Sequence, residues 1–131
     1  MDGRAFHVHA MGNCHGRLLA ATGAFSGQLH AYTDDWQLLD DYPKGSAGFS
    51  RLVSIMQFGS ECLVGAMARG DHRPKLLRLA GNELVPVDGW PAGDRTETTV
   101  VFEDQALAFN DQGETRSLLS WNGNSLSLIH I

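Results

Sequence analysis

The stretch SRLVSIMQFGSECLVGAM (50–67) decides the fold, because it reads as two strands joined by a short turn. Residues 50–57 alternate in character, as expected for an extended chain whose successive side chains face opposite sides. One side is expected to carry Leu52, Ser54 and Met56, and the other Arg51, Val53 and Ile55. Residues 61–67 are almost all apolar, which is typical of a strand buried on both faces. The stretch therefore predicts a β-hairpin with a buried second strand.

Two further strands are predicted directly after this hairpin. PKLLRLA (74–80) follows a polar loop, and NELVPVD (82–88) follows the turn AGN. No segment keeps apolar residues at the three-and-four spacing of a helix for the three turns or so of a typical helix. We therefore predict an all-β protein that places four short strands in about 44 residues.

The same pattern recurs before and after the central stretch. It aligns CHGRLLAATG (14–23), FGSECLVGAM (58–67) and FEDQALAFND (102–111), so that Leu19, Leu63 and Leu107 recur every 44 residues. A fixed spacing of this length indicates repeated structural units that bury their faces against one another. We interpret the chain as about three such repeats.

A second signature of the repeat is a shared Asp-x-aromatic-Pro. LLDDYPKG (38–45) matches VPVDGWPAG (85–93), and the two segments align Asp40 with Asp88, Tyr42 with Trp90, and Pro43 with Pro91. Large aromatic side chains at equivalent places are expected to pack between repeats. We interpret Trp36, Tyr42, Trp90 and Trp121 in this way, with carbohydrate stacking as the alternative.

Four antiparallel strands in a repeat of this length resemble the blades of the β-propeller superfamily. GRLLAATG (16–23) and GQLHAYTDDWQLL (27–39) look like generic bacterial propeller repeats, without the Trp-Asp pair of WD repeats or the Gly-Gly pair of kelch repeats. The resemblance implies a fragment of about three four-stranded blades within residues 1–125. The blades are expected at about 6–48, 49–95 and 96–125.

Closed propellers have roughly 4–8 blades, so three blades leave two apolar faces uncovered. We expect the remaining blades of the same chain, or a self-assembled copy, to cover them. LSLIHI (126–131) resembles the translation of a transposon adaptor used in DNA library preparation. We therefore expect residues 126–131 to be a non-native tail on a truncated fragment, the alternative being a genuine fourth strand.

Composition excludes some classes of protein. The net charge of −5 argues against a nucleic-acid partner. No apolar run approaches the roughly 18 residues of a membrane-spanning helix, and MDGRAFHVHAMG (1–12) does not resemble a signal peptide. Two cysteines do not make a disulfide framework, so Cys14 and Cys62 are expected to be small buried apolar residues. The compartment is left open.

The repeat also indicates a candidate ligand site. His7, Arg51 and Arg95 fall at equivalent places 44 residues apart, as do His9, Val53 and Glu97. If these positions begin the innermost strands, His7, Arg51 and Arg95 ring one mouth of the propeller channel, with His9 and Glu97 beside them. A cluster of cations favours an anionic ligand such as a carboxylate or phosphate. The alternative is solvated residues at strand starts.

Two other motifs are given weaker interpretations. HVHAMGNCH (7–15) offers histidines with strand spacing, but it lacks the spacing of a complete zinc site, so no metal or cofactor is predicted. ARGDHRPK (68–75) contains Arg-Gly-Asp and is predicted to be a solvated turn.

Function is predicted only as a class. The preferred reading is a bacterial binding module for a small anionic ligand or a protein. One alternative is a propeller-type hydrolase or lyase, possibly glycan-directed, because YTDDW (32–36) faintly resembles the Asp-box of sialidase-type propellers. Another is a structural repeat of a surface protein. No Gly-x-Ser-x-Gly or His-Glu-x-x-His motif occurs, so a non-catalytic role is favoured without excluding an enzyme.

Overall fold

The computed structural model describes residues 7–23, 26–44 and 49–129, which form twelve β-strands. These are β1 (His7–Cys14), β2 (Arg17–Gly23), β3 (Gly27–Tyr32), β4 (Trp36–Tyr42), β5 (Arg51–Phe58), β6 (Glu61–Met67), β7 (Leu76–Ala80), β8 (Glu83–Pro86), β9 (Arg95–Phe102), β10 (Gln105–Gln112), β11 (Thr115–Trp121) and β12 (Leu126–Ile129). The described residues contain no helix, and therefore none long and apolar enough to cross a membrane. The prediction of an all-β protein is confirmed.

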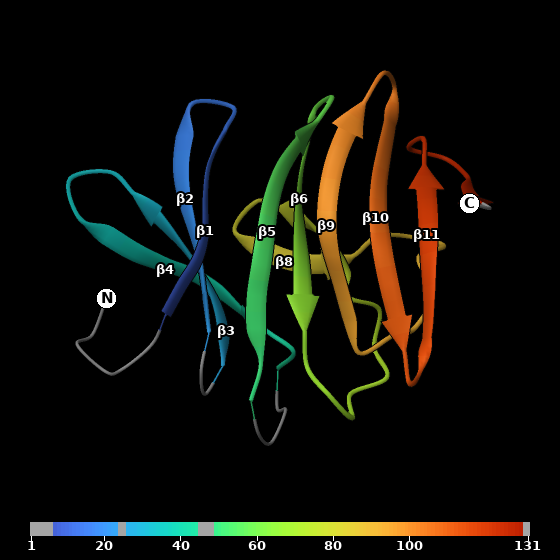
Figure 1. The fold of residues 1–131 in the computed structure, drawn as a ribbon. Helices are drawn as coiled ribbons and strands as arrows, with labels where there is room; N and C mark the ends of the chain where they lie inside the picture. The colour runs from blue at the N-terminus through green and yellow to red at the C-terminus, as the bar shows by residue number, and fades with distance from the viewer. Residues whose placement is uncertain (1–6, 24–25, 45–48, 130–131) are drawn as a thin grey trace.

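The strands form three antiparallel meanders that follow one another along the chain. In the first unit β1 pairs with β2, β2 with β3, and β3 with β4. The second unit, β5–β8, and the third unit, β9–β12, have the same connectivity. Figure 1 shows the units in chain order, from blue to red across the molecule. Each of the three units is thus a four-stranded antiparallel meander.

Adjacent units are joined by very little backbone pairing. One residue pair, Gly23 with Arg51, connects β2 to β5, and another, Met67 with Arg95, connects β6 to β9. The sheet that results is open, with β4 and β12 at its two ends. The units are therefore held together mainly by side chains packed between their faces.

The second unit is buried on both sides, as its sequence predicts. β6 covers the predicted range 61–67, and its neighbouring residues Leu63 and Val64 are both fully buried. Leu63 packs toward the third unit and Val64 toward the first. Alternate side chains of one strand therefore supply two separate interfaces.

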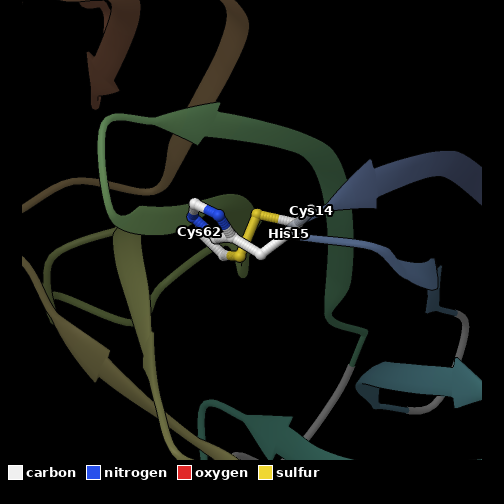
Figure 2. A group of neighbouring side chains, drawn as sticks. All are labelled: Cys14, His15 and Cys62. Atoms are coloured by element: carbon white, nitrogen blue, oxygen red, sulfur yellow. A yellow bond between two sulfur atoms is a disulfide. The ribbon is translucent and has the colours of Figure 1, made fainter.

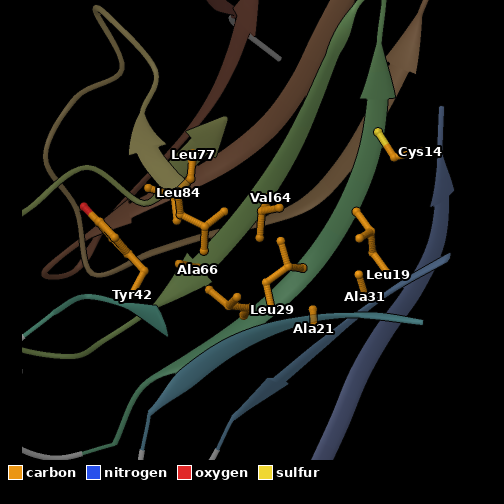
Figure 3. Packing of buried hydrophobic residues seen from close by; sticks show 11 residues of the cluster. Cys14, Leu19, Ala21, Leu29, Ala31, Tyr42, Val64, Ala66, Leu77 and Leu84 are labelled. Carbon is orange, nitrogen blue, oxygen red and sulfur yellow. The ribbon is translucent and has the colours of Figure 1, made fainter. Parts of the chain in front are cut away.

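The first interface lies between the first and second units and is built from small and branched apolar side chains (Figure 3). Its buried members are Cys14, Leu19, Ala21, Leu29, Ala31, Tyr42, Leu52, Val64, Ala66, Leu77 and Leu84. Two side chains of the first unit also hydrogen-bond across it. The Tyr42 hydroxyl donates to the Pro74 carbonyl at 2.8 Å, and the Leu84 amide donates to Asp40 Oδ2 at 2.7 Å.

The second interface lies between the second and third units and is richer in aromatic side chains. Its buried members are Leu63, Leu76, Val87, Trp90, Ala106, Ala108, Leu119 and Trp121. Trp90 Nε1 donates to the Thr96 hydroxyl at 3.0 Å, and this hydroxyl donates to Asn110 Oδ1 at 3.0 Å. Tyr42 and Trp90, aligned by the repeat, therefore both anchor one unit to the next, which confirms their interpretation as packing residues.

One detail of the central hairpin differs from the sequence expectation. Leu52 and Met56 were expected on the same side, but Leu52 packs in the first interface and Met56 against the second. The reason is a β-bulge between Leu52 and Ser54, which inserts an unpaired residue and reverses the alternation after it. β1 has a similar irregularity between Val8 and Ala10, and the β9–β10 pairing has one between Glu97 and Val100. The bulge is thus a repeated feature of the first strand in each unit.

The third unit differs slightly from its expected bounds. β9 begins at Arg95, so the unit starts at the last residue assigned to the preceding repeat. Leu126–Ile129 forms β12 and pairs with β11. An alternating segment of any origin can pair in this way, so the expected non-native origin of residues 126–131 stays a prediction.

The outward face of each end unit carries exposed apolar side chains. In β2 of the first unit, Leu19 and Ala21 face the second unit. The alternate β2 residues Leu18 and Ala20 therefore point to the outer side, as do the residues paired with them in β1 and β3. This open face carries Val8, Met11, Leu18, Tyr32 and Leu38, each between 39% and 56% exposed. The corresponding face of the third unit carries Val100 and Phe102, the latter 63% exposed.

Candidate functional site

The candidate residues from the sequence begin equivalent strands. His7, Arg51 and Arg95 are the first residues of β1, β5 and β9, and β1 lies against β5 as β5 does against β9. They also belong to one continuous row across the sheet. This cross-strand row runs His7, Gly23, Arg51, Met67, Arg95, Asp111, Arg116. Because neighbouring strands lie about 4.8 Å apart, successive members of the predicted trio are roughly 10 Å apart along the row.

Gly23 is required where the row passes from the first unit to the second. A side-chain carbon at position 23 would lie 2.5 Å from Arg51 Cα and 2.7 Å from the Ser50 carbonyl oxygen. The absence of a side chain therefore lets β5 approach β2 closely enough to place Arg51 near His7, at the start of β1.

The cations of the row differ in their partners. Arg95 forms an ion pair with Glu97, and Glu97 also binds Arg116 at 3.0 Å. Arg116 in turn lies 3.6 Å from Asp111. Arg51 is exposed and forms no ion pair within the described part of the chain. The positive charge available to a ligand is therefore concentrated at Arg51 rather than spread evenly over the predicted ring.

His9 lies beside Arg51 and His7, and its ring centroid is 6.2 Å from that of His7. Partial burial lowers the pKa of His9, and the positive charges of Arg51 and His7 lower it further, against a smaller raising effect from a hydrogen bond to the Gly23 backbone. Its Nε2 atom is buried and has no hydrogen-bond partner in the described ranges. The neutral form of His9 is thus favoured, and its Nε2 is a buried nitrogen that lacks a partner within the described residues.

A small cavity lies beside the Arg95 end of the row. It has a volume of about 90 Å³ and is lined by Met67, Arg69, Asp94, Arg95, Asp111 and Gly113. Water occupies about 30 Å³ per molecule in the liquid, so this space fits a few waters or one small polar group. Its lining contains two arginines and two aspartates, so it offers no clear preference for either sign of charge.

The loop 68–75 is exposed at Arg69, Gly70, His72 and Arg73, as predicted for a solvated turn, but its last residue is not. Lys75 is completely buried, and its Nζ donates to the carbonyls of Asp71 (3.0 Å) and Gly93 (2.9 Å) and to Asp71 Oδ1 (3.1 Å). Arg73 binds the same carboxylate at 2.5 Å and donates to the Lys44 carbonyl at 2.8 Å. The Asp71 of Arg-Gly-Asp is therefore engaged within the chain, and the loop is tied to Lys44 of the first unit and to Gly93, shortly before β9.

Ionisation in this loop follows from these contacts. The Arg73 guanidinium holds the pKa of Asp71 well below its ordinary value, with smaller help from Lys75 and opposition from burial. Burial lowers the pKa of Lys75, and its ion pair with Asp71 offsets part of that effect. Asp71 is therefore ionised near neutral pH, where it accepts hydrogen bonds from both cations.

The sequence interpretation of the cysteines was wrong. Cys14 at the end of β1 and Cys62 in β6 form a disulfide across the first interface, with their Cα atoms 6.0 Å apart. The repeat in the sequence could have indicated this disulfide. Cys14 and Cys62 flank equivalent hairpin turns of successive units, β1–β2 and β5–β6, and packed units bring such turns together. His15 follows Cys14 in the first of these turns.

Comparison of the chain with protein-family models, with curated proteins and with solved structures found no match.

Proposed function

We propose that this chain is part of a propeller-like repeat protein that binds an anionic group at the cross-strand row. The repeated meander, the bulge in each first strand and the face-to-face packing of units support the propeller arrangement. The first strands would then lie nearest the channel, with His7, Arg51 and Arg95 at one mouth of it.

The unpaired guanidinium of Arg51 carries the binding proposal. It is exposed, and His7 and His9 lie on the neighbouring first strand. A guanidinium presents a planar set of donors that matches both oxygens of a carboxylate or phosphate. Arg95 contributes less, because Glu97 already neutralises it. The preferred ligand is thus a carboxylate or phosphate group bound mainly between Arg51 and the histidines.

The test is a calorimetric titration of the full chain with inorganic phosphate and with citrate, comparing wild type with Arg51→Ala. Loss of a hydrogen bond to a charged group costs roughly 1.5–3 kcal/mol, so affinity should fall roughly tenfold to a hundredfold. Arg17→Ala is the matched control, because Arg17 lies at the opposite end of β2. Equal affinities of Arg51→Ala and wild type would overturn the proposal.

The partner that best fits the open faces is a second copy of the chain. The repeat pairs the Leu19-type face of each unit with the Val64-type face of the next. The third unit exposes the first kind of face, which carries Val100 and Phe102, and the first unit exposes the second kind, which carries Met11 and Tyr32. The two open faces are therefore complementary halves of an interface that the chain already forms twice, which favours head-to-tail association.

Mixing experiments distinguish this association from a symmetric one. Tyr32→Glu places a charge on the open face of the first unit, and Phe102→Glu places one on that of the third. In sedimentation velocity the wild type should associate, each variant alone should be monomeric, and an equimolar mixture should form dimers through its two intact faces. A monomeric wild type, or a mixture that stays monomeric, would contradict head-to-tail pairing.

The hydrolase or lyase alternative stays a prediction without added support. Asp35, in the segment that resembles an Asp-box, accepts a hydrogen bond from the adjacent Trp36 amide at 2.8 Å. This contact organises the local turn between β3 and β4 and is typical of aspartates in turns.

A further inference from the structure

Cys14, His15 and Cys62 form a compact group of potential metal ligands at the opposite end of β1 from His7. One ligand atom from each residue, two sulfurs and a ring nitrogen, lies within 4.8 Å of the others. Figure 2 shows the imidazole of His15 beside the disulfide. Cys14 is buried, Cys62 is half-buried and His15 is exposed, so the group is accessible from the His15 side.

The backbone around this group is held by contacts other than the disulfide. Gln57 pairs with Cys62 in the β5–β6 ladder, and its Oε1 accepts a hydrogen bond from the His15 amide at 2.9 Å. Asn13 Oδ1 accepts from the Gly16 amide at 2.9 Å, which closes the turn that carries His15. The three residues therefore stay close together when the bond between the sulfurs is broken.

β1 also approaches β5 closely just before the group. A side-chain carbon at Gly12 would lie 3.1 Å from Ile55 Cγ2, so β1 fits tightly against the second unit. Cys14 follows two residues later, in a buried position of the first interface. Packing of the interface thus fixes the position of Cys14 as well.

Two cysteine thiolates and an imidazole are a ligand set that suits a soft or borderline divalent cation. Zn²⁺ binds cysteine sulfur and histidine nitrogen in tetrahedral sites, and three protein ligands leave a fourth position for water. A disulfide cannot serve in this way, since its sulfurs are joined and carry no thiolate charge.

We propose that reduction of the Cys14–Cys62 disulfide converts this group into a Zn²⁺ site, with both sulfurs and the His15 imidazole as ligands. A dithiol reductant supplies two electrons and two protons, and its own sulfurs join as a disulfide while the Cys14–Cys62 bond breaks to two thiols. Zn²⁺ then displaces the two thiol protons and forms two Zn–S bonds.

The consequence is that the first interface is cross-linked in either redox state. The disulfide links the first and second units under oxidising conditions, where such bonds persist. The metal links the same residues when the thiols are free. This site is separate from the cross-strand row, so its test does not depend on anion binding.

The experiment titrates the full chain with Co²⁺, a spectroscopic substitute for Zn²⁺, after anaerobic reduction by a phosphine. The phosphine breaks the same bond, is oxidised to its oxide with oxygen from water, and leaves no competing thiol. The reduced wild type should develop thiolate-to-cobalt charge-transfer absorption that saturates at one Co²⁺ per chain and is abolished by Zn²⁺. The oxidised wild type and the Cys14→Ser/Cys62→Ser double variant should show none.

Substitution of the histidine tests the third ligand. His15→Ala should weaken Co²⁺ binding by at least the roughly 10–100-fold that loss of a supporting residue costs at metal sites. His72→Ala, an exposed histidine in the loop 68–75, is the matched control and should bind as the wild type does. Absence of charge-transfer absorption in the folded, reduced wild type, or equal affinity of His15→Ala, would overturn the proposal.

If the chain unfolds when the disulfide is reduced, refolding on addition of Zn²⁺ provides a second test. Zn²⁺ should then restore the strand signal in circular dichroism, because metal binding contributes directly to folding. Failure of Zn²⁺ to restore it would also overturn the proposal.

Discussion

The two interfaces of the molecule join equivalent units by different means. The first interface is built largely from alanines and leucines and is cross-linked by Cys14–Cys62. The second contains two buried tryptophans, with Phe58 packed against Trp121 at a centroid distance of 5.3 Å, and a buried chain of hydrogen bonds from Trp90. The comparison teaches that one repeat geometry can be stabilised by a covalent bond in one place and by aromatic packing in another.

The largest effect is expected from a substitution that disrupts the second interface. Trp90→Ala removes a side chain that is 3% exposed and leaves the Thr96 hydroxyl without its donor. Loss of a buried aromatic side chain costs about 3–5 kcal/mol, and urea unfolding should show a decrease of this size in the free energy of unfolding.

Trp36→Ala is the control for this change. Trp36 is only partly buried and stacks on Tyr32 at 5.3 Å, on the open face of the first unit. It should cost clearly less. Equal losses for the two tryptophans would mean that the second interface does not depend on Trp90.

The next largest effect concerns the first interface. The Cys14→Ser/Cys62→Ser double variant opens a disulfide that spans 48 residues. Cross-links of this kind contribute about 2–4 kcal/mol, chiefly by restricting the unfolded chain. The urea midpoint of the oxidised wild type should therefore lie well above that of the double variant when metal is absent. A midpoint that does not respond to the cysteines would contradict the assigned cross-link.

The smallest effect lies in the loop 68–75, which contacts the first unit at Tyr42 and Lys44. The pKa of Asp71 is lower in the folded chain than in the unfolded chain, because Arg73 and Lys75 stabilise its carboxylate. Its contribution to stability is therefore complete above the unfolded pKa of about 3.9 and is lost as the pH falls toward the folded value. Between about pH 5 and pH 2, the free energy of unfolding should fall more steeply for wild type than for Asp71→Asn.

Asp34→Asn removes a carboxylate from an exposed turn and controls for the change in net charge. Parallel pH profiles for wild type and Asp71→Asn would show that the loop does not act as described.

Short-range patterns in the sequence predicted much of the fold. The β5–β6 hairpin, the double burial of β6 and the anchoring of units by Tyr42 and Trp90 all follow from local character and from the repeat. The bulge at Val53 could not be predicted in the same way. It adds one unpaired residue without the glycine or proline that would mark it, and it alters which side chains face each interface.

The candidate site was predicted only in part. The spacing placed His7, Arg51 and Arg95 at the starts of equivalent strands, which the structure bears out as a position, while their binding role stays a prediction. The neutralisation of Arg95 depends on Arg116, which approaches Glu97 from another strand of the sheet. The burial of Lys75 likewise depends on the Gly93 carbonyl, 18 residues away. Contacts between distant residues such as these require the folded chain.

The single residue pairs that join the units have a mechanical consequence. Each pair connects two units at the end where their first strands begin. Neighbouring units can therefore separate by rotating about that point, as about a hinge. The Cys14–Cys62 bond joins the first and second units at the opposite end of β1, so these two units cannot rotate apart. The third unit is held at its far end by packing alone. A pulling force or a denaturant should therefore open the molecule between the second and third units first.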